Sequence, residues 1–183
     1  MKPRTIIFWI CVLVIADQAI KIIIDTFYFE GHFEIIPSML EFKPIFNDKH
    51  SYFNVLLNNK FNINVGLIAH LLLFLVLEIV VISLYFLFRK HINKSRKLLD
   101  IAFVFQISGL ICALSGNLIW ENGVLDYLYL KPLFIFDLKD LYNNVFVILF
   151  LVYIIINASE VKALEEKDII SHIRVILKRD NKQ

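Results

Sequence analysis

The sequence predicts an all-α integral membrane protein whose fold is a bundle of four transmembrane helices. The 183 residues are 58% hydrophobic with a mean hydropathy of +0.68, a composition too apolar for a soluble domain. The apolar residues form long blocks instead of periodic stripes. A bilayer core about 30 Å thick requires about 20 apolar residues per helix, and four blocks approach that length: 6–24, 64–88, 101–120 and 141–158.

The first block resembles a secretory signal peptide, because basic residues precede its apolar run. It nevertheless contains Asp17 and Lys21, and no small-residue cleavage site follows it. We therefore interpret this block as a retained span. Ionisable residues inside a span are costly and usually have a structural or functional use.

Basic residues predict the orientation of the chain. They precede the first span, fill the connection 89–97 between the second and third spans, and recur in the tail 159–183. The positive-inside rule places all of these segments in the cytoplasm. Both termini of this multi-pass protein are then cytoplasmic, and residues 25–63 and 121–140 lie outside.

The segments beyond the spans predict little additional structure, so we treat 1–183 as a single membrane domain. Partial alternation in FYFEGHFEI and MLEFKPIF predicts a small β-like region within 25–63, packed on the outer leaflet. In the tail, apolar residues at helical spacing predict an amphipathic helix on the cytoplasmic membrane face. Packing of this helix on the spans or on a partner protein is the alternative.

Several kinds of site and function are disfavoured. Cys11 and Cys112 lie inside predicted spans without metal-ligand spacing, so we interpret them as free, small hydrophobic residues and expect no metal and no cofactor. Nucleic-acid binding lacks a basic, aromatic-lined surface. A transporter would be expected to show a pair of interrupted helices, which is not seen in the sequence.

Three aspartates in the stretch 123–140 are the main candidates for chemistry. Asp126 begins an apolar run that leads back toward the membrane, Asp140 begins the fourth span, and Asp137 lies between them. Acidic residues at a membrane surface often serve solubility alone. A turn between Asp126 and Asp140 would instead bring their carboxylates within about 6 Å, where the two share a proton and act as base and acid in peptide hydrolysis.

Five short motifs follow one another along the chain in a recognisable order. They are DQAIK (17–21), NDKHSY (47–52), GNLIWE (116–121), VLDY (124–127) and FDLKD (136–140). This series resembles the motifs of the lipoprotein signal peptidases, also called signal peptidase II. The resemblance implies a four-span aspartyl peptidase of the bacterial inner membrane that removes signal peptides from diacylglyceryl-modified prolipoproteins.

The resemblance also implies roles for individual residues. VLDY is similar to V-x-D-F and FDLKD to F-N-x-A-D, which makes Asp126 and Asp140 the catalytic pair. DQAIK is similar to D-Q-x-[ST]-K and supplies Asp17 and Lys21. Because these two residues are one helical turn apart, they form either a simple internal ion pair or a structural brace for the site.

Two asparagines are implied to shape the site. NDKHSY keeps Asn47 of N-x-G-A-A-F, although the residues after it differ, and GNLIWE keeps Asn117 of G-N-[LIVFY]-x-D-R. Asparagine offers both a donor and an acceptor to a peptide backbone. Simple polar roles in a helix or turn are the alternative.

Three substitutions depart from the family pattern. Trp120 and Glu121 replace an aspartate and an arginine, and Asp137 replaces an asparagine. The arginine is implied to hold backbone carbonyls of the signal peptide, which Glu121 cannot do. Asp137 adds a like charge that should raise the proton affinity of the pair, so its replacement by asparagine should preserve or raise cleavage. Lys131 and Lys139 are candidates to replace the lost cation.

Two functions therefore remain open. The first is a divergent membrane aspartyl endopeptidase acting on lipid-modified prolipoproteins through Asp126 and Asp140. The alternative is a catalytically inactive relative that binds a lipoprotein or a partner helix as a subunit of an envelope complex. The retained aspartates favour the first function, and the lost arginine with the altered 47–52 segment favours the second. Membrane lipid is a partner in both.

Overall fold

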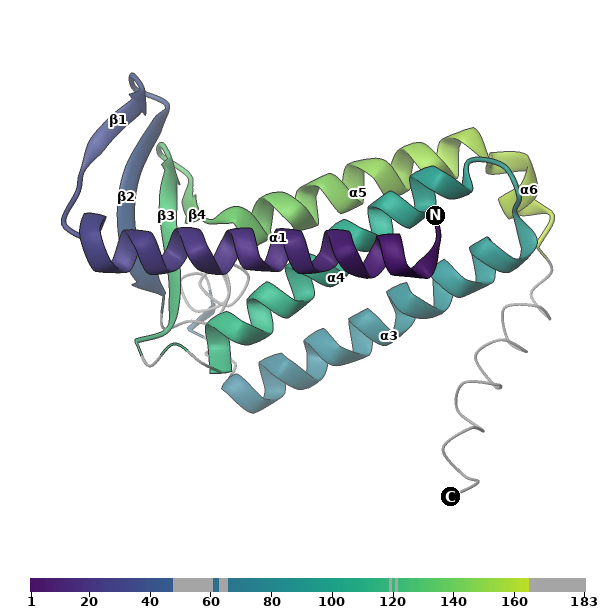
Figure 1. Ribbon diagram of the computed structural model, residues 1–183, viewed down its shortest axis with the longest axis horizontal. Helices are drawn as coiled ribbons and strands as arrows, with labels where there is room; N and C mark the ends of the chain where they lie inside the picture. The colour runs from purple at the N-terminus through teal and green to yellow at the C-terminus, as the bar shows by residue number, and fades with distance from the viewer. Residues whose placement is uncertain (48–60, 63–65, 119, 121, 165–183) are drawn as a thin grey trace.

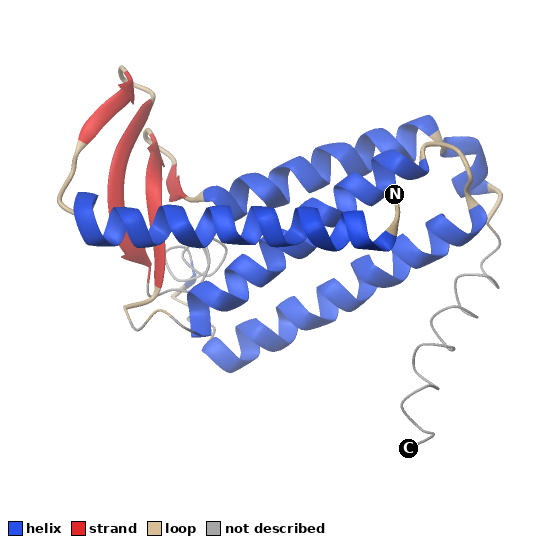
Figure 2. Cartoon of the chain, viewed as in Figure 1, coloured by secondary structure: helices blue, strands red, loops and turns tan. Residues whose placement is uncertain are grey.

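Four long helices lie side by side, and a small sheet stands at one end of them (Figures 1 and 2). The computed structural model describes residues 1–47, 61–62, 66–118, 120 and 122–164. In this part of the chain the helices long and apolar enough to cross a membrane are four in number, which confirms the predicted spans. They are α1 (Pro3–Ile23), α3 (Leu67–His91), α4 (Arg96–Leu118) and α5 (Leu138–Ile156).

The helix ends differ from the predicted span ends by a few residues. α1 continues into a π-helical turn, η1 (Ile24–Tyr28), so residues 24–28 are helical and do not begin the β-like region. α3 runs through Arg89 to His91, because basic residues end an apolar block without ending a helix. A short helix, α6 (Ala158–Lys162), follows α5. The predicted tail helix falls largely on 165–183, outside the described residues.

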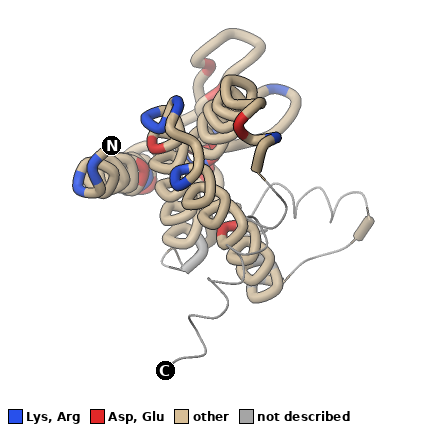
Figure 3. Tube along the Cα trace, turned by 90° about the vertical axis from the view of Figure 1, so that its right-hand side faces the viewer, with Lys and Arg blue, Asp and Glu red and all other residues tan. Residues whose placement is uncertain are grey.

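The end of the bundle that holds the N-terminus is closed by an apolar cluster and a buried carboxylate. Tyr85, Phe88 and Tyr153 belong to this cluster. Asp100 is buried beside it, accepts a hydrogen bond from the Tyr85 hydroxyl at 2.9 Å, and pairs with Arg89 Nε at 3.2 Å and with the amino group of the first residue. Lysine and arginine residues gather at this end (Figure 3).

The sheet lies at the opposite end and has four antiparallel strands in the order β1-β2-β3-β4. They are β1 (Phe33–Ile36), β2 (Leu40–Asn47), β3 (Val124–Leu130) and β4 (Phe134–Phe136). The predicted small β-like region is therefore present, but half of the sheet comes from residues 124–136, which were predicted only as an external connection. The pairing of β2 with β3 joins the two segments that follow α1 and α4.

Aromatic side chains attach the sheet to the helix ends. Leu125 and Tyr127 of β3 are buried against Ile24 of η1, with Phe46 and Trp120 packed around them. This cluster fixes β3, and therefore Asp126, relative to the end of α1.

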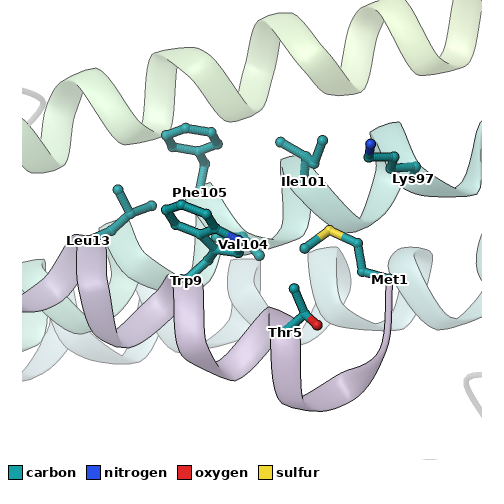
Figure 4. A pocket seen from close by; sticks show the side chains of 8 residues that line it. All are labelled: Met1, Thr5, Trp9, Leu13, Lys97, Ile101, Val104 and Phe105. Carbon is teal, nitrogen blue, oxygen red and sulfur yellow. The ribbon is translucent and has the colours of Figure 1, made fainter.

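An apolar pocket of about 480 Å³ lies between α1 and α4, toward the other end of the bundle (Figure 4). Its lining comprises Met1, Thr5, Trp9, Leu13, Lys97, Ile101, Val104 and Phe105. None of the aspartates near the sheet lines this pocket, so it is separate from the candidate site described next.

Candidate active site

The predicted catalytic aspartates meet where the sheet contacts the ends of α1 and α5. Asp126 projects from β3, and Asp137 and Asp140 lie at the start of α5. One carboxylate oxygen of each lies within 4.8 Å of those of the other two. Asp126 and Asp140 are therefore as close as the sequence analysis expects.

The beginning of α5 fixes the positions of Asp137 and Asp140. Asp137 is the N-cap residue, and its Oδ1 accepts a hydrogen bond from the Asp140 backbone N–H at 3.3 Å. Asp140 Oδ2 in turn accepts from the Asp137 N–H at 3.2 Å. This reciprocal capping box satisfies backbone donors that the first turn leaves unpaired, so the helix start itself orients the Asp140 carboxylate.

Asp126 is positioned by the pairing of β2 with β3. It lies opposite Ile45, next to an irregularity of the ladder between Phe42 and Ile45. Asn47, at the end of β2, donates from Nδ2 to Asp126 Oδ2 at 3.1 Å. The structure therefore brings together Asn47 and Asp126, which are far apart in the sequence.

Lys139 lies between the carboxylates. Its Nζ is 2.8 Å from Asp137 Oδ1, 3.1 Å from Asp126 Oδ1 and 3.4 Å from Asp140 Oδ2. Of the two lysines considered from sequence, Lys139 is therefore the one at the site. Lys131 instead pairs with Glu34 and Glu41 at the far end of the strands.

Lys21 joins α1 to the start of α5. Its Nζ is 3.0 Å from Asp17 Oδ2 and 2.6 Å from Asp137 Oδ2, and all three side chains are 0% exposed. The internal ion pair between Asp17 and Lys21 is present, and Lys21 also reaches the N-cap carboxylate of α5. These contacts are what a structural brace would require.

The contacts of Asp137 change the expected effect of replacing this residue by asparagine. Asp137 does raise the pKa of Asp126, as its like charge predicts. However, it is fully buried between two lysines and caps α5, so it also holds the site together. Replacing it alone by asparagine is therefore expected to weaken the fold, and an unchanged or higher cleavage is no longer expected.

Burial and neighbouring charges set the proton affinities of the two aspartates outside the spans. Burial is the main cause that raises the pKa of Asp126, and Asp137 adds to it, whereas Lys139 and Asn47 oppose the rise. Burial would also raise the pKa of Asp137, but Lys139 and Lys21 together hold it below its usual value. Asp137 therefore remains ionised more readily than Asp126.

Of the remaining predicted residues, Asn117 and Trp120 lie at or just after the end of α4. Trp120 donates from Nε1 to Gln18 Oε1 at 3.3 Å, and its ring packs near Phe46 with centroids 6.2 Å apart. Asn117 belongs to the last turn of α4, but its side chain lies outside the described residues. Glu121 and residues 48–52 are also outside them.

Fold and site together define a class: a multi-pass membrane protein with interacting carboxylates at one end of a four-helix bundle. The family follows from the sequence comparison, in which the model of signal peptidase (SPase) II matches residues 9–156. The chain belongs to this family. Membership supports a membrane protease that processes lipoproteins.

Two solved structures have the same fold, and both are described as a bacterial membrane enzyme structure obtained by the in meso method. The one at 2.3 Å resolution has a TM-score of 0.62 and 21% identity, covering 90% of this chain and 96% of its own. The one at 1.9 Å has a TM-score of 0.59 and 23% identity, covering 84% of this chain and 94% of its own. A search of curated proteins gave no match.

Proposed function

We propose that this chain is a divergent lipoprotein signal peptidase that removes the signal peptide of lipid-modified prolipoproteins through Asp126 and Asp140. The observation that supports this most directly is the approach of the two carboxylates, whose oxygens lie within 4.8 Å. They come from different elements, β3 and α5, each with its own positioning contacts. Two carboxylates at this separation titrate as a unit and can share one proton.

The different surroundings of the two aspartates favour a division of roles. The Asp126 side chain is 5% exposed and that of Asp140 is 41% exposed. We assign the shared proton to Asp126, because it is the more buried of the two and burial disfavours the charged form of a carboxyl group. Asp140 then takes a proton from a water that attacks the scissile carbonyl carbon, while Asp126 donates its proton to the carbonyl oxygen. Return of a proton from Asp140 to the leaving amine, and of the hydroxyl proton to Asp126, breaks the C–N bond and restores the pair.

The proposed orientation places this site at the external face of the bacterial cytoplasmic membrane. It rests on the basic end of the bundle, where the N-terminus, α6 and the connection between α3 and α4 lie together (Figures 1 and 3). Positive charge next to spans favours the cytoplasmic side. The lipid part of a prolipoprotein and its apolar signal segment would then approach the site from the bilayer.

Cysteine labelling in intact cells tests this orientation. In a background with Cys11→Ala and Cys112→Ala, Lys94→Cys should resist a membrane-impermeant maleimide, because the α3–α4 connection is inside. Leu133→Cys, at the turn between β3 and β4 where the native side chain is 63% exposed, should react. Both should react after the membrane is permeabilised. Labelling of Lys94→Cys in intact cells would show that the orientation is reversed.

A second candidate function follows from Lys139. Its ammonium group contacts both proposed catalytic aspartates, in the region where a reacting water would have to lie. The second candidate is a catalytically inactive member of the family that holds a lipoprotein or a partner helix within an envelope complex. Binding without turnover distinguishes it from the peptidase.

One reconstitution experiment separates the two functions. The purified protein in lipid vesicles is incubated with a synthetic prolipoprotein peptide that carries a diacylglyceryl cysteine, and release of the signal peptide is measured by mass spectrometry. The peptidase should release it, and the double variant Asp126→Asn with Asp140→Asn should not. Binding of the peptide by both proteins with release by neither would reject the peptidase and support the inactive binder.

A further inference from the structure

Lys139 is a buried cation whose partners come from two elements. The residue is 7% exposed, and its ammonium contacts Asp137 and Asp140 of α5 and Asp126 of β3 at 2.8, 3.4 and 3.1 Å. A buried lysine is costly unless opposite charge surrounds it. Three carboxylates supply that charge, so the ammonium form is the one that suits this position.

The location of this cation opposes the sharing of a proton by Asp126 and Asp140. An opposite charge within hydrogen-bond distance favours the ionised form of a carboxylate. Lys139 touches both members of the pair, and it is the strongest of the influences that lower the pKa of Asp126 against the effect of burial. A pair in which both members are ionised has a base for water but lacks an acid for the carbonyl oxygen.

Asp137 holds Lys139 in this position. Its Oδ1 makes the shortest of the three contacts with Lys139, and its Oδ2 is held by Lys21. The chain Lys21–Asp137–Lys139 therefore runs from α1 to the pair. The titratable and charged groups around this network are Asp17, Lys21, Cys112, Asp126, Tyr127, Asp137, Asp140 and Tyr142.

We propose that Lys139 is a positioning residue that opposes the protonation of Asp126 and Asp140 and thereby confines cleavage to more acidic conditions. This inference rests on the proposed peptidase function. In this proposal, the charge of Lys139 restrains cleavage at higher pH. The restraint is absent when position 139 carries a small or apolar side chain. Asp137 is its second part, because it fixes the ammonium between the pair.

Lys139→Met tests the restraint, because methionine keeps a long flexible side chain and removes the charge. Loss of a cation raises the pKa values of nearby carboxylates, so the pair should keep its shared proton to higher pH. An opposite charge at this distance lowers a carboxyl pKa by about 1–3 units. The alkaline limb of the plot of cleavage rate against pH should therefore move upward by about 1–3 pH units. The change should appear in kcat, and KM should change little.

A second readout does not depend on cleavage. The infrared stretching band of a protonated carboxyl group reports the shared proton directly, and its loss on Asp126→Asn plus Asp140→Asn assigns it to the pair. The pH at which this band disappears should be higher in Lys139→Met than in the wild type. An unmoved band in a folded Lys139→Met protein overturns the inference, whatever the activity.

The two readouts keep the inference and the proposed function distinguishable. A moved band without cleavage by either protein rejects the peptidase function and leaves the role of Lys139 intact. If Lys139→Met unfolds, the double variant Lys139→Met with Asp137→Asn replaces it, because this change removes both partners of a buried pair and asparagine remains a good N-cap. It should show an upward shift smaller than that of Lys139→Met, because loss of the Asp137 charge lowers the pKa of Asp126 while loss of the Lys139 charge raises it. Lys131→Met removes a cation from an exposed pair away from the site and should shift neither readout.

Discussion

Replacement of Lys21 by methionine is expected to lower the free energy of unfolding by about 3–5 kcal/mol, the range for removal of one partner from a buried ion pair. Lys21 is fully buried between Asp17 and Asp137. Without its ammonium, Asp17 loses the cation one turn away, and the N-cap carboxylate of α5 is left with the contact to Lys139. Methionine fills a similar volume, so the loss would be electrostatic and would not reflect a cavity.

Reversible unfolding in mixed micelles, with an increasing mole fraction of a denaturing detergent, measures this loss. The double variant Lys21→Met with Asp17→Asn should recover part of it, because a carboxylate left without its cation is then removed as well. Lys131→Met, which breaks partly exposed pairs with Glu34 and Glu41, should have little effect. A Lys21→Met protein as stable as the wild type would show that Lys21 does not brace the site.

The four spans were predictable because the bilayer sets the length of apolar sequence that a helix needs. Their ends were less predictable, since helices continue past apolar blocks when the following residues still favour a helix. Arg89 to His91 at the end of α3 and the π-helical turn after α1 are both of this kind. Hydropathy detects the hydrocarbon boundary, whereas the helix ends where its backbone finds another partner.

Half of the sheet escaped prediction for a different reason. The run from Val124 to Leu130 is apolar and short, and such a run is ambiguous between a strand and the approach to a span. It becomes a strand because β2, from a distant part of the sequence, supplies the pairing. Strand formation depends on such neighbours more than on intrinsic preference. The partial alternation within 33–47 was visible because it is local.

The sequence predicts which residues form the candidate site, but it does not predict which contacts they make with one another. Motif order places Asp126 and Asp140 together, and the structure agrees on their proximity. Asp137 was predictable only as an additional charge, because its two cations come from α1 and from its own helix. Lysine and aspartate residues in a sequence show that ion pairs are possible, whereas the packing of the helices determines which pairs form.

Single replacement of either catalytic candidate by asparagine is expected to lower the rate of signal-peptide release by at least about 10²–10⁴-fold, the usual contribution of a general acid or base. One carboxylate cannot take a proton from water and also supply one to the carbonyl oxygen. Asparagine matches aspartate in shape, so Asp140→Asn can retain the contact with the Asp137 N–H. Asp126→Asn keeps one acceptor oxygen, so it can retain the contact with Asn47 or the contact with Lys139, which use different oxygens of Asp126.

The pH dependence of signal-peptide release tests the same pair in a second way. Because burial raises the pKa of Asp126, Asp126 keeps its proton to higher pH than an exposed aspartate and loses it as the pH rises further. The wild type should therefore lose activity on the alkaline side as Asp126 deprotonates, and Asp126→Asn should lack this limb in whatever activity remains. The measurement is kcat and KM for a diacylglyceryl-modified peptide across pH, with detergent unfolding as a check on the fold.

Asp25→Asn, at an exposed position in η1 near the same end of the bundle, should behave as the wild type at every pH. Release by Asp126→Asn or Asp140→Asn within tenfold of the wild type would exclude that residue from the proposed pair.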